Sequence, residues 1–465
     1  MKRFLWLGFV VCLYLICTGC GETFRPIIIP NPPTFPNPAA AHTVVSINNN
    51  APPSGQLENT VGTSMVIDVS GDTDVSIVNV GLAPVHAVQQ SASVILVANH
   101  SVPGALSDSL TKLSFNGTTI TSTATISLPA NSAPNFVATT EVSQAYVSLP
   151  NLASIGVVNT NSNALAYIVP VGNNPDAIAE TPNGQKLYVA NQADGTISGF
   201  NTVDRSPRTV TGSFNGPLWL NARSDSQRLY VLNGNGQVST IDTTSTAGPD
   251  TVIDASISVP GAAYMVYDGN KNRLYIPGGN QLTILDVSQS VPAVLGGGPI
   301  TIAAISQTLR GATDPCASTT AQSPLTAVAV AALPDGSRAY VGAYYDDSNN
   351  NVCPQVTVID AVSNTFKSST AVPGFPDATI PTLGGLPNPY YVPVCATARF
   401  RFGMAAGGDS SRAYLSACDN GLVNIIDTST DSYILNLAEP VGVRPPIPPN
   451  PQNPPQNPVF LMAGP

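Results

Sequence analysis

The chain has 465 residues, of which only 10% are charged, and it contains 38 Gly and 43 Pro. Closely spaced turns between strands need these residue types, so the composition favours an all-β protein and argues against long helices. The net charge of −10 at pH 7 argues against a nucleic-acid partner or an anionic lipid surface, because those bind positively charged proteins.

The first 19 residues are typical of an export signal. Lys2 and Arg3 precede an apolar run that ends at residue 17, which is shorter than the roughly 18 residues needed to span a bilayer. The following "CTGC" resembles the bacterial lipobox, although Cys17 stands where that pattern prefers Leu. The resemblance implies diacylation of Cys20, and ordinary cleavage within residues 20–42 is the alternative.

Two Pro-rich segments flank the central part of the chain. Residues 20–42 include "PIIIPNPPTFPNPAAA", which we expect to form an extended tether that lifts the domain from the membrane. Residues 441–465 form a Pro-rich tail, and we expect its segment "RPPIPPNPQNPPQNP", residues 444–458, to lie outside the fold as well.

Between these ends a strand pattern recurs, as in "KLYVANQADGTISGFNT" and "RLYVLNGNGQVSTIDT". Each copy has an apolar strand, a turn such as "TPNG", a strand with Tyr, and an "ID"-type strand. The Tyr position is occupied by Leu96, Tyr146, Tyr188, Tyr230, Tyr275, Tyr340 and Tyr414. The central copies recur every 42 to 45 residues, which is typical of four-stranded propeller blades.

These units resemble the YVTN β-propeller repeat, which is frequent in exported bacterial and archaeal proteins. The resemblance covers residues 84–440 and implies the fold but no shared catalytic residue. Seven copies predict seven four-stranded blades, with residues 43–83 closing the ring. Because "TSMVIDVSGDTDVSIVNV" resembles the last two strands of another unit, an incomplete eighth blade at the N-terminus is the alternative.

Cysteine positions predict an oxidising compartment. Outside the leader and lipobox the chain holds Cys316, Cys353, Cys395 and Cys418, an even number suited to disulfides. Cys316 and Cys353 are nearly equidistant from the hairpin turn of the sixth unit, and Cys395 and Cys418 from that of the seventh. We therefore predict the pairs 316–353 and 395–418. A zinc site at these cysteines is the alternative to disulfides, but the four cysteines form no CxxC motif.

No known catalytic motif stands out in the sequence. We find no GxSxG, HExxH or Walker sequence, and we expect neither a cofactor nor a metal. His86 and His100 could supply a general base, although a core or solvated histidine is the commoner case. The loop "DDSNNN" at 346–351 offers oxygen ligands for calcium but lacks the spacing of a known site, so a solvated loop is expected.

Three insertions enlarge the last two units, where the Tyr spacing rises to 65 and then 74 residues. They lie at 305–323, 344–354 and 370–400, in connections that open on the same face of a propeller. Long connections are uncommon unless functional, so we predict a disulfide-stapled cap that binds a ligand. Its candidate contacts are Tyr344, Tyr345, Tyr390 and Tyr391, with Asp346 and Asp347 at the rim.

The sequence thus favours a lipid-anchored cell-envelope propeller that binds an envelope protein or a glycan without catalysis. One alternative is a lactonase-like hydrolase, a relative implied by the resemblance. A quinone-dependent dehydrogenase is disfavoured, because such propellers carry a Trp in every blade and only Trp219 remains outside the leader. A surface-layer structural component is a further alternative, which differs from a binding scaffold mainly in self-association.

Overall fold

The structure is a computed structural model of the whole chain. It separates into residues 1–36 and 37–465, and all the residues described below belong to the second unit. The described residues are 43–49, 61–69, 72–100, 108–117, 119–139, 143–306, 310, 316, 320–321, 323–348, 352–372, 382–383, 386–387, 402–418, 422–434 and 457–464. Among them, no helix is long and apolar enough to cross a membrane.

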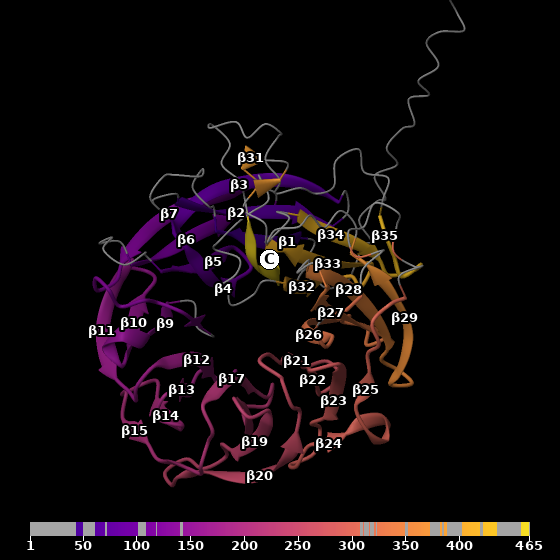
Figure 1. The fold of residues 1–465 in the computed structure, drawn as a ribbon. Coiled ribbons are helices and arrows are strands. Elements are labelled where there is room, and N and C mark those ends of the chain that lie inside the picture. The colour runs from indigo at the N-terminus through magenta and orange to yellow at the C-terminus, as the bar shows by residue number, and fades with distance from the viewer. Residues whose placement is uncertain are drawn as a thin grey trace, which may run out of the picture. The chain divides into compact units, whose positions relative to one another are not determined.

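Eight small sheets, antiparallel except for the short edge strand β16, are arranged in a ring as the blades of a β-propeller (Figure 1). From the inside outwards, the strands of blades 1 to 4 are β36 (Pro458–Ala463), β1 (Thr43–Asn48), β2 (Val61–Asp68) and β3 (Thr73–Leu82); β4 (Pro84–Ser91), β5 (Val94–Asn99), β6 (Ser109–Phe115) and β7 (Ile120–Ser127); β8 (Val137–Ala138), β9 (Gln144–Leu149), β10 (Ser154–Asn159) and β11 (Ala164–Pro170); β12 (Pro175–Glu180), β13 (Lys186–Asn191), β14 (Thr196–Asn201) and β15 (Pro207–Arg208).

In the same order, the strands of blades 5 to 8 are β17 (Pro217–Ala222), β18 (Arg228–Asn233), β19 (Gln237–Asp242) and β20 (Asp250–Ser258), with β16 (Val210–Thr211) at the edge; β21 (Val266–Asp268), β22 (Arg273–Gly278), β23 (Gln281–Asp286) and the divided outer strand β24 (Ala293–Val294) and β25 (Ile300–Thr301); β26 (Thr326–Ala332), β27 (Arg338–Asp346), β28 (Val352–Asp360) and β29 (Thr365–Ala371); β32 (Phe402–Ala406), β33 (Arg412–Ala417), β34 (Leu422–Asp427) and β35 (Ser432–Tyr433). Short 3₁₀ helices η1 (Pro150–Leu152) and η2 (Leu295–Gly297) and a small hairpin of β30 (Thr382–Leu383) and β31 (Leu386–Pro387) complete the assignment.

The ring has eight blades, so the first expectation of seven is corrected in favour of the eight-bladed alternative. The seven repeat units form blades 2 to 8, and blade 1 combines both ends of the described chain. Its inner strand β36 pairs with β1, with Val44 opposite Ala463. The predicted tail therefore contains a strand of the fold, because Val459 and Leu461 bury apolar side chains that a detached tail would leave in water.

The strand order gives the propeller two distinct faces. Each inner strand begins on the face that carries the connections between blades and the hairpins between second and third strands, which we call the entry face. The opposite face carries the hairpins between first and second and between third and fourth strands, and we call it the exit face. For example, residues 171–174 lie on the entry face and residues 181–185 on the exit face.

The Tyr position of the repeat builds the contact between neighbouring blades. Tyr188, Tyr230, Tyr275, Tyr340 and Tyr414 are fully buried, as the alternating pattern of the second strands predicts. The hydroxyl of Tyr188 donates to Asp250 of the next blade, and that of Tyr230 to the Val287 carbonyl of the next. A single blade cannot bury both faces of its sheet, so these contacts are what make the ring stable.

Candidate functional site: the entry face of blade 7

A disulfide joins the connection before blade 7 to the hairpin between its second and third strands. Cys316 and Cys353 are bonded, with Cα atoms 5.9 Å apart, and both side chains are buried. This confirms the predicted pair. Cys418 is also in a disulfide, but its predicted partner Cys395 lies outside the described residues.

Backbone hydrogen bonds attach the same connection to the hairpin at a second place. The Ser323 amide donates to the Asp346 carbonyl at 3.0 Å, and the Ser348 amide donates to the Thr320 carbonyl at 2.9 Å. Ala321 and Asp347 form an antiparallel bridge between these two bonds. The described residues of the predicted insertions at 305–323 and 344–354 therefore contact each other on the entry face.

Gln355 anchors the start of this connection. Its Oε1 accepts a hydrogen bond from the Ile305 amide at 3.0 Å, and its Nε2 donates to the Ala303 carbonyl at 2.9 Å. In other blades an Asn at the end of the second strand has the same role: the Oδ1 atoms of Asn99 and Asn191 accept from the Gly81 and Gly172 amides. The Asn of the repeat thus fixes the connections that form the entry face.

The predicted contact residues that the structure describes divide between half-buried and buried positions. Tyr344 is half-buried and packs 5.3 Å from the ring of Phe402 in blade 8, and Asp346 is half-buried as well. Tyr345 and Asp347 are instead buried, with exposed fractions of 3% and 0%. Successive side chains of a strand point to opposite sides, so Tyr345 faces the core beside Cys353 and is not a surface contact.

The burial of Asp347 likewise removes it from the predicted rim, because the bridge with Ala321 covers it. Tyr390 and Tyr391 lie outside the described residues, as do Cys20 and the loop positions 349–351. The carboxylate of Asp347 and the sulfur atoms of Cys316 and Cys353 lie within 4.8 Å of one another. Because both sulfurs are in the disulfide, this group has no thiolate to offer a metal.

A buried Arg lies beneath the same surface. Arg310 is 5% exposed, and its guanidinium lies 5.3 Å from the centroid of the Tyr345 ring. A cation over an aromatic face gains electrostatic energy that grows when water is removed. Arg310 was not singled out in the sequence, where it is one basic residue in a long connection.

Aromatic side chains from five blades meet at the ring axis. His86 stacks on Phe136 with centroids 3.9 Å apart and lies 4.6 Å from Phe460. Trp219 continues the group, 5.3 Å from Phe136 and 4.8 Å from Tyr264. Sequence reasoning missed this axial cluster, although each member lies at or near the start of an inner strand, which was the available signal.

The axial cluster leaves little free space. The cavity beside it, lined by Val328, Phe402, Met404 and Phe460 among others, has a volume of ≈ 10 Å³, about the space of one water molecule. The Val137 amide donates to His86 Nδ1 at 3.4 Å, so this nitrogen acts as a hydrogen-bond acceptor. Burial raises the pKa of the Tyr264 phenol to about 12, which keeps it protonated at neutral pH.

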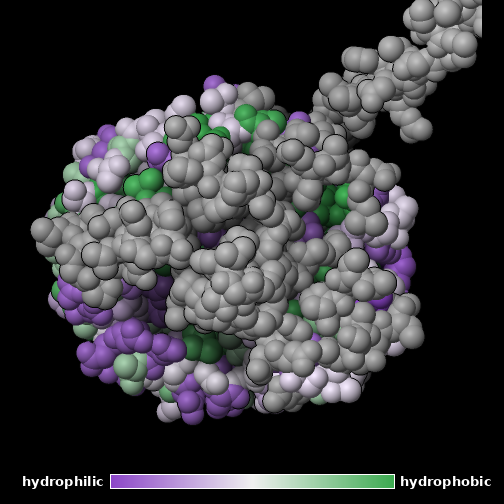
Figure 2. Space-filling view, turned by 45° about the horizontal axis from the view of Figure 1, so that its top comes forward, coloured by the Kyte–Doolittle hydropathy of each residue, from purple (hydrophilic) through white to green (hydrophobic). Residues whose placement is uncertain are grey.

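The surface coloured in Figure 2 mixes hydrophilic and hydrophobic residues without one large hydrophobic area. Exposed apolar side chains occur singly or in small groups, such as Tyr167, Val203 and Phe366. A recognition surface in this part of the chain would therefore combine polar contacts with a few apolar ones.

No protein-family model matches the chain, and neither does any curated protein. Solved structures do resemble it. The dihydro-heme d1 dehydrogenase NirN, in complex with DHE, has a TM-score of 0.57 at 10% identity over 91% of this chain and 75% of that one. AztD from Citrobacter koseri has a TM-score of 0.53 at 10% identity over 90% and 97%. A protein from Lactobacillus plantarum has a TM-score of 0.50 at 12% identity over 90% and 98%.

The likeness is one of fold. These neighbours are β-propeller proteins of varied function, and the low identities carry no activity from them to this chain.

Proposed function

We propose that the chain is an exported cell-envelope β-propeller, lipid-anchored at Cys20, which acts as a non-catalytic scaffold that binds an envelope protein or a glycan. The proposed location in the cell envelope is supported by the apolar leader, the lipobox-like "CTGC" and the Pro-rich tether. The binding surface in this proposal is the entry face of blades 7 and 8.

The observation that carries the proposal is the attachment of the 305–323 connection to the blade 7 hairpin. One disulfide and two backbone hydrogen bonds hold it there. Ordering a loop costs conformational entropy, and a loop ordered before binding does not incur that cost when its partner arrives. A stapled, enlarged surface is therefore suited to recognition.

The small free volume beside the ring axis favours a binding scaffold over a lactonase-like hydrolase. Pockets for small molecules have volumes of roughly 300–1,000 Å³. The cavity next to the axial cluster has ≈ 10 Å³, so this place among the described residues is too small for a lactone ring. Binding to the side chains of the entry face needs no such pocket.

The binding role is tested by capture of partners from an envelope extract and on a glycan array. The intact chain is compared with a variant in which residues 371–394 are shortened, and circular dichroism and thermal melting confirm that the variant is folded. We expect the shortened variant to lose capture. Unchanged capture would contradict the proposed surface, and lactone hydrolysis by a preparation that captures nothing would favour the enzyme alternative.

The anchor is tested separately. We expect the intact chain to partition into the detergent phase of a cloud-point extraction, and Cys20→Ser to remain in the aqueous phase. Cys17→Ser is the matched control, because it removes a nearby thiol but leaves the modified position intact. Equal partitioning of wild type and Cys20→Ser would remove lipidation from the proposal.

A further inference from the structure

Five hairpins between third and fourth strands share one geometry on the exit face. In each, the third strand ends with Asp or Asn, and the residue four positions later has a positive φ near 50–60°. These residues are Asp72, Asn163, Arg205, Asn364 and Asp431. Asp and Asn adopt this left-handed conformation more readily than other non-glycine residues. Arg205, with φ 59°, is the exception.

At two of these positions an Asp joins the hairpin to the preceding blade. Asp72 accepts from the Tyr414 hydroxyl at 3.2 Å and pairs with Arg412 at 3.0 Å. Asp431 accepts from the Tyr340 hydroxyl at 2.6 Å and pairs with Lys367. We call this arrangement, in which a carboxylate lies between a repeat Tyr and a cation, a latch.

The junction of blades 3 and 4 has the opposite charge at the latch position. Arg205 occupies it, and the facing residues of blade 3 are the uncharged Tyr146 and Gln144, which hydrogen-bond each other. Arg205 forms no ion pair with any residue in the described ranges. The neighbouring Asp204 carboxylate instead accepts from the Ser206 amide and hydroxyl, at 2.9 and 2.7 Å.

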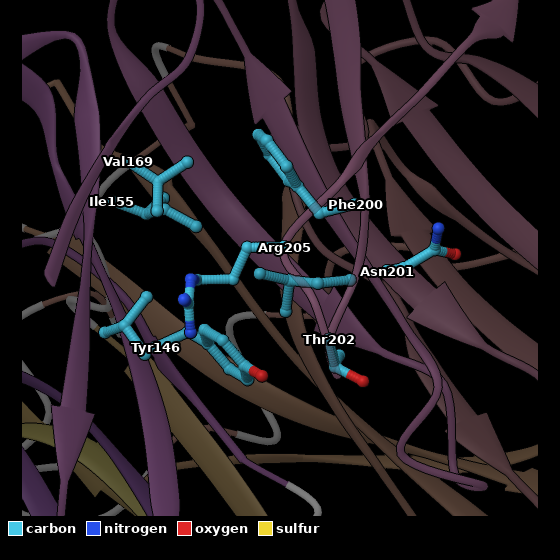
Figure 3. Close-up of a pocket in the computed structure, with 9 residues that line it drawn as sticks. Tyr146, Ile155, Val169, Phe200, Asn201, Thr202 and Arg205 are labelled. Atoms are coloured by element: carbon cyan, nitrogen blue, oxygen red, sulfur yellow. The ribbon is translucent and has the colours of Figure 1, made fainter. Parts of the chain in front are cut away.

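The Arg205 side chain is held in place beside a small pocket. Its guanidinium carbon lies 4.0 Å from the centroid of the Tyr167 ring in β11. Figure 3 shows the side chain directed toward Tyr146 within a pocket whose apolar wall includes Ile155, Val169 and Phe200. The pocket volume of ≈ 10 Å³ is about the space of one water molecule, so a larger group would contact the guanidinium from the surface and would not enter the pocket.

We propose that Arg205 is a receptor for a carboxylate on a partner protein, which pairs with Arg205 as Asp72 pairs with Arg412 and Asp431 with Lys367 at their own junctions. A guanidinium binds carboxylates in a planar, charge-assisted arrangement. Tyr167 and Val203, with exposed fractions of 51% and 88%, offer apolar contacts beside it. The partner chemistry is thus an exposed Asp or Glu side chain flanked by apolar residues.

This surface lies on the exit face, so it is distinct from the entry-face surface of the proposed function. The proposal does not depend on export, on the lipid or on the insertions. The backbone sets this hairpin apart from the other four, because Arg is less suited to a left-handed φ than the Asp or Asn at the equivalent positions.

The test uses the full chain and two peptides, acetyl-Ala-Glu-Ala-amide and acetyl-Ala-Gln-Ala-amide, titrated by saturation-transfer NMR. We expect the Glu peptide to bind and the Gln peptide to bind at least about tenfold more weakly, since only the first offers a charge-assisted hydrogen bond. Arg205→Asn suits the left-handed backbone and should weaken binding of the Glu peptide by at least about tenfold as well.

Two further variants distinguish a loss of peptide binding at Arg205 from a loss of folding and from a general effect of the protein's net charge. Arg205→Asp should abolish binding of the Glu peptide, because two carboxylates repel each other, and it should not lower the melting temperature, because Asp suits the left-handed backbone at this position. Lys271→Asn removes one exposed positive charge elsewhere on the exit face and should leave binding unchanged. Equal binding of both peptides, full binding by Arg205→Asn, an equal loss in Lys271→Asn, or no binding by the wild type would each overturn the proposal. Displacement of the Glu peptide by an equal concentration of inorganic phosphate would also overturn it, because the site would then be a general anion site.

Discussion

The hydroxyl of Tyr188 donates a 2.9 Å hydrogen bond to Asp250 Oδ2, which joins blade 4 to blade 5 across 62 residues of sequence. Lys186 and Arg208 lie 3.1 and 2.9 Å from the same carboxylate, which is fully buried. A buried charge is tolerated only when its partners compensate for the lost water. The repeat Tyr and its preceding Lys or Arg therefore form a latch together with the next blade.

Removing the carboxylate should destabilise the ring more than removing the hydroxyl. We expect Asp250→Ala to lower the free energy of unfolding by about 3–5 kcal/mol, because it leaves Lys186 and Arg208 without their buried counter-charge. Tyr188→Phe removes one hydrogen bond to a charged group, which should cost about 1.5–3 kcal/mol. Urea denaturation followed by circular dichroism measures both. Asp204→Ala, at an exposed turn, is the control and should change stability by no more than about 0.5 kcal/mol.

The C-terminal strand β36 should be essential for a closed ring. A chain that ends at Pro458 loses the buried side chains of Val459 and Leu461 and the Phe460 contact with His86. Each fully buried apolar side chain contributes roughly 1.5–3 kcal/mol, so the total approaches the stability of a typical domain. We expect a lower melting temperature and faster proteolysis. Deletion of Pro465 alone is the control, and equal melting of the two truncated chains would contradict the role of β36.

The disulfide of Cys316 and Cys353 should stabilise the entry face. It closes a loop with a sequence separation of 37, for which the chain-entropy model gives about 4 kcal/mol. We expect the double variant Cys316→Ala/Cys353→Ala to melt at a lower temperature than the wild type under non-reducing conditions. A reductant should narrow this difference, since it opens the bond only in the wild type. A difference that reductant leaves unchanged would point to lost packing instead of the lost cross-link.

Stability should fall with acid partly through His100. Burial lowers the pKa of this imidazole below its usual 6.5, although nearby Asp108 opposes the shift. The unfolded chain then takes up the proton at higher pH than the folded chain does. The stabilising contribution is full above about pH 6.5 and is lost as the pH falls toward the folded value. Between about pH 8 and pH 5 the wild type should lose more stability than His100→Gln. Urea denaturation at each pH measures the stability of both proteins. An equal loss of stability in the wild type and in His100→Gln would show that His100 does not contribute to the acid sensitivity.

Most of the blades can be predicted from the amino-acid sequence. The Tyr strands of units such as those around Tyr188 and Tyr230 repeat at a constant spacing, and each unit contains its own four strands. The same is true of the Cys316–Cys353 pair, because both residues belong to one blade and its adjoining connection. Contacts between residues close in the chain leave a regular pattern in the sequence, and that pattern can be read.

The closure of the ring and the residues that fill its axis could not be predicted from the sequence and are known from the three-dimensional structure. Strand β36 follows a Pro-rich segment and pairs with β1 at the opposite end of the chain, so no local pattern indicates its partner. The axial cluster draws His86, Phe136, Trp219, Tyr264 and Phe460 from five different blades. Burial of Tyr345 and Asp347 depends in the same way on a connection that folds back over them. These contacts join residues with no fixed separation in sequence, and packing in three dimensions alone brings them together.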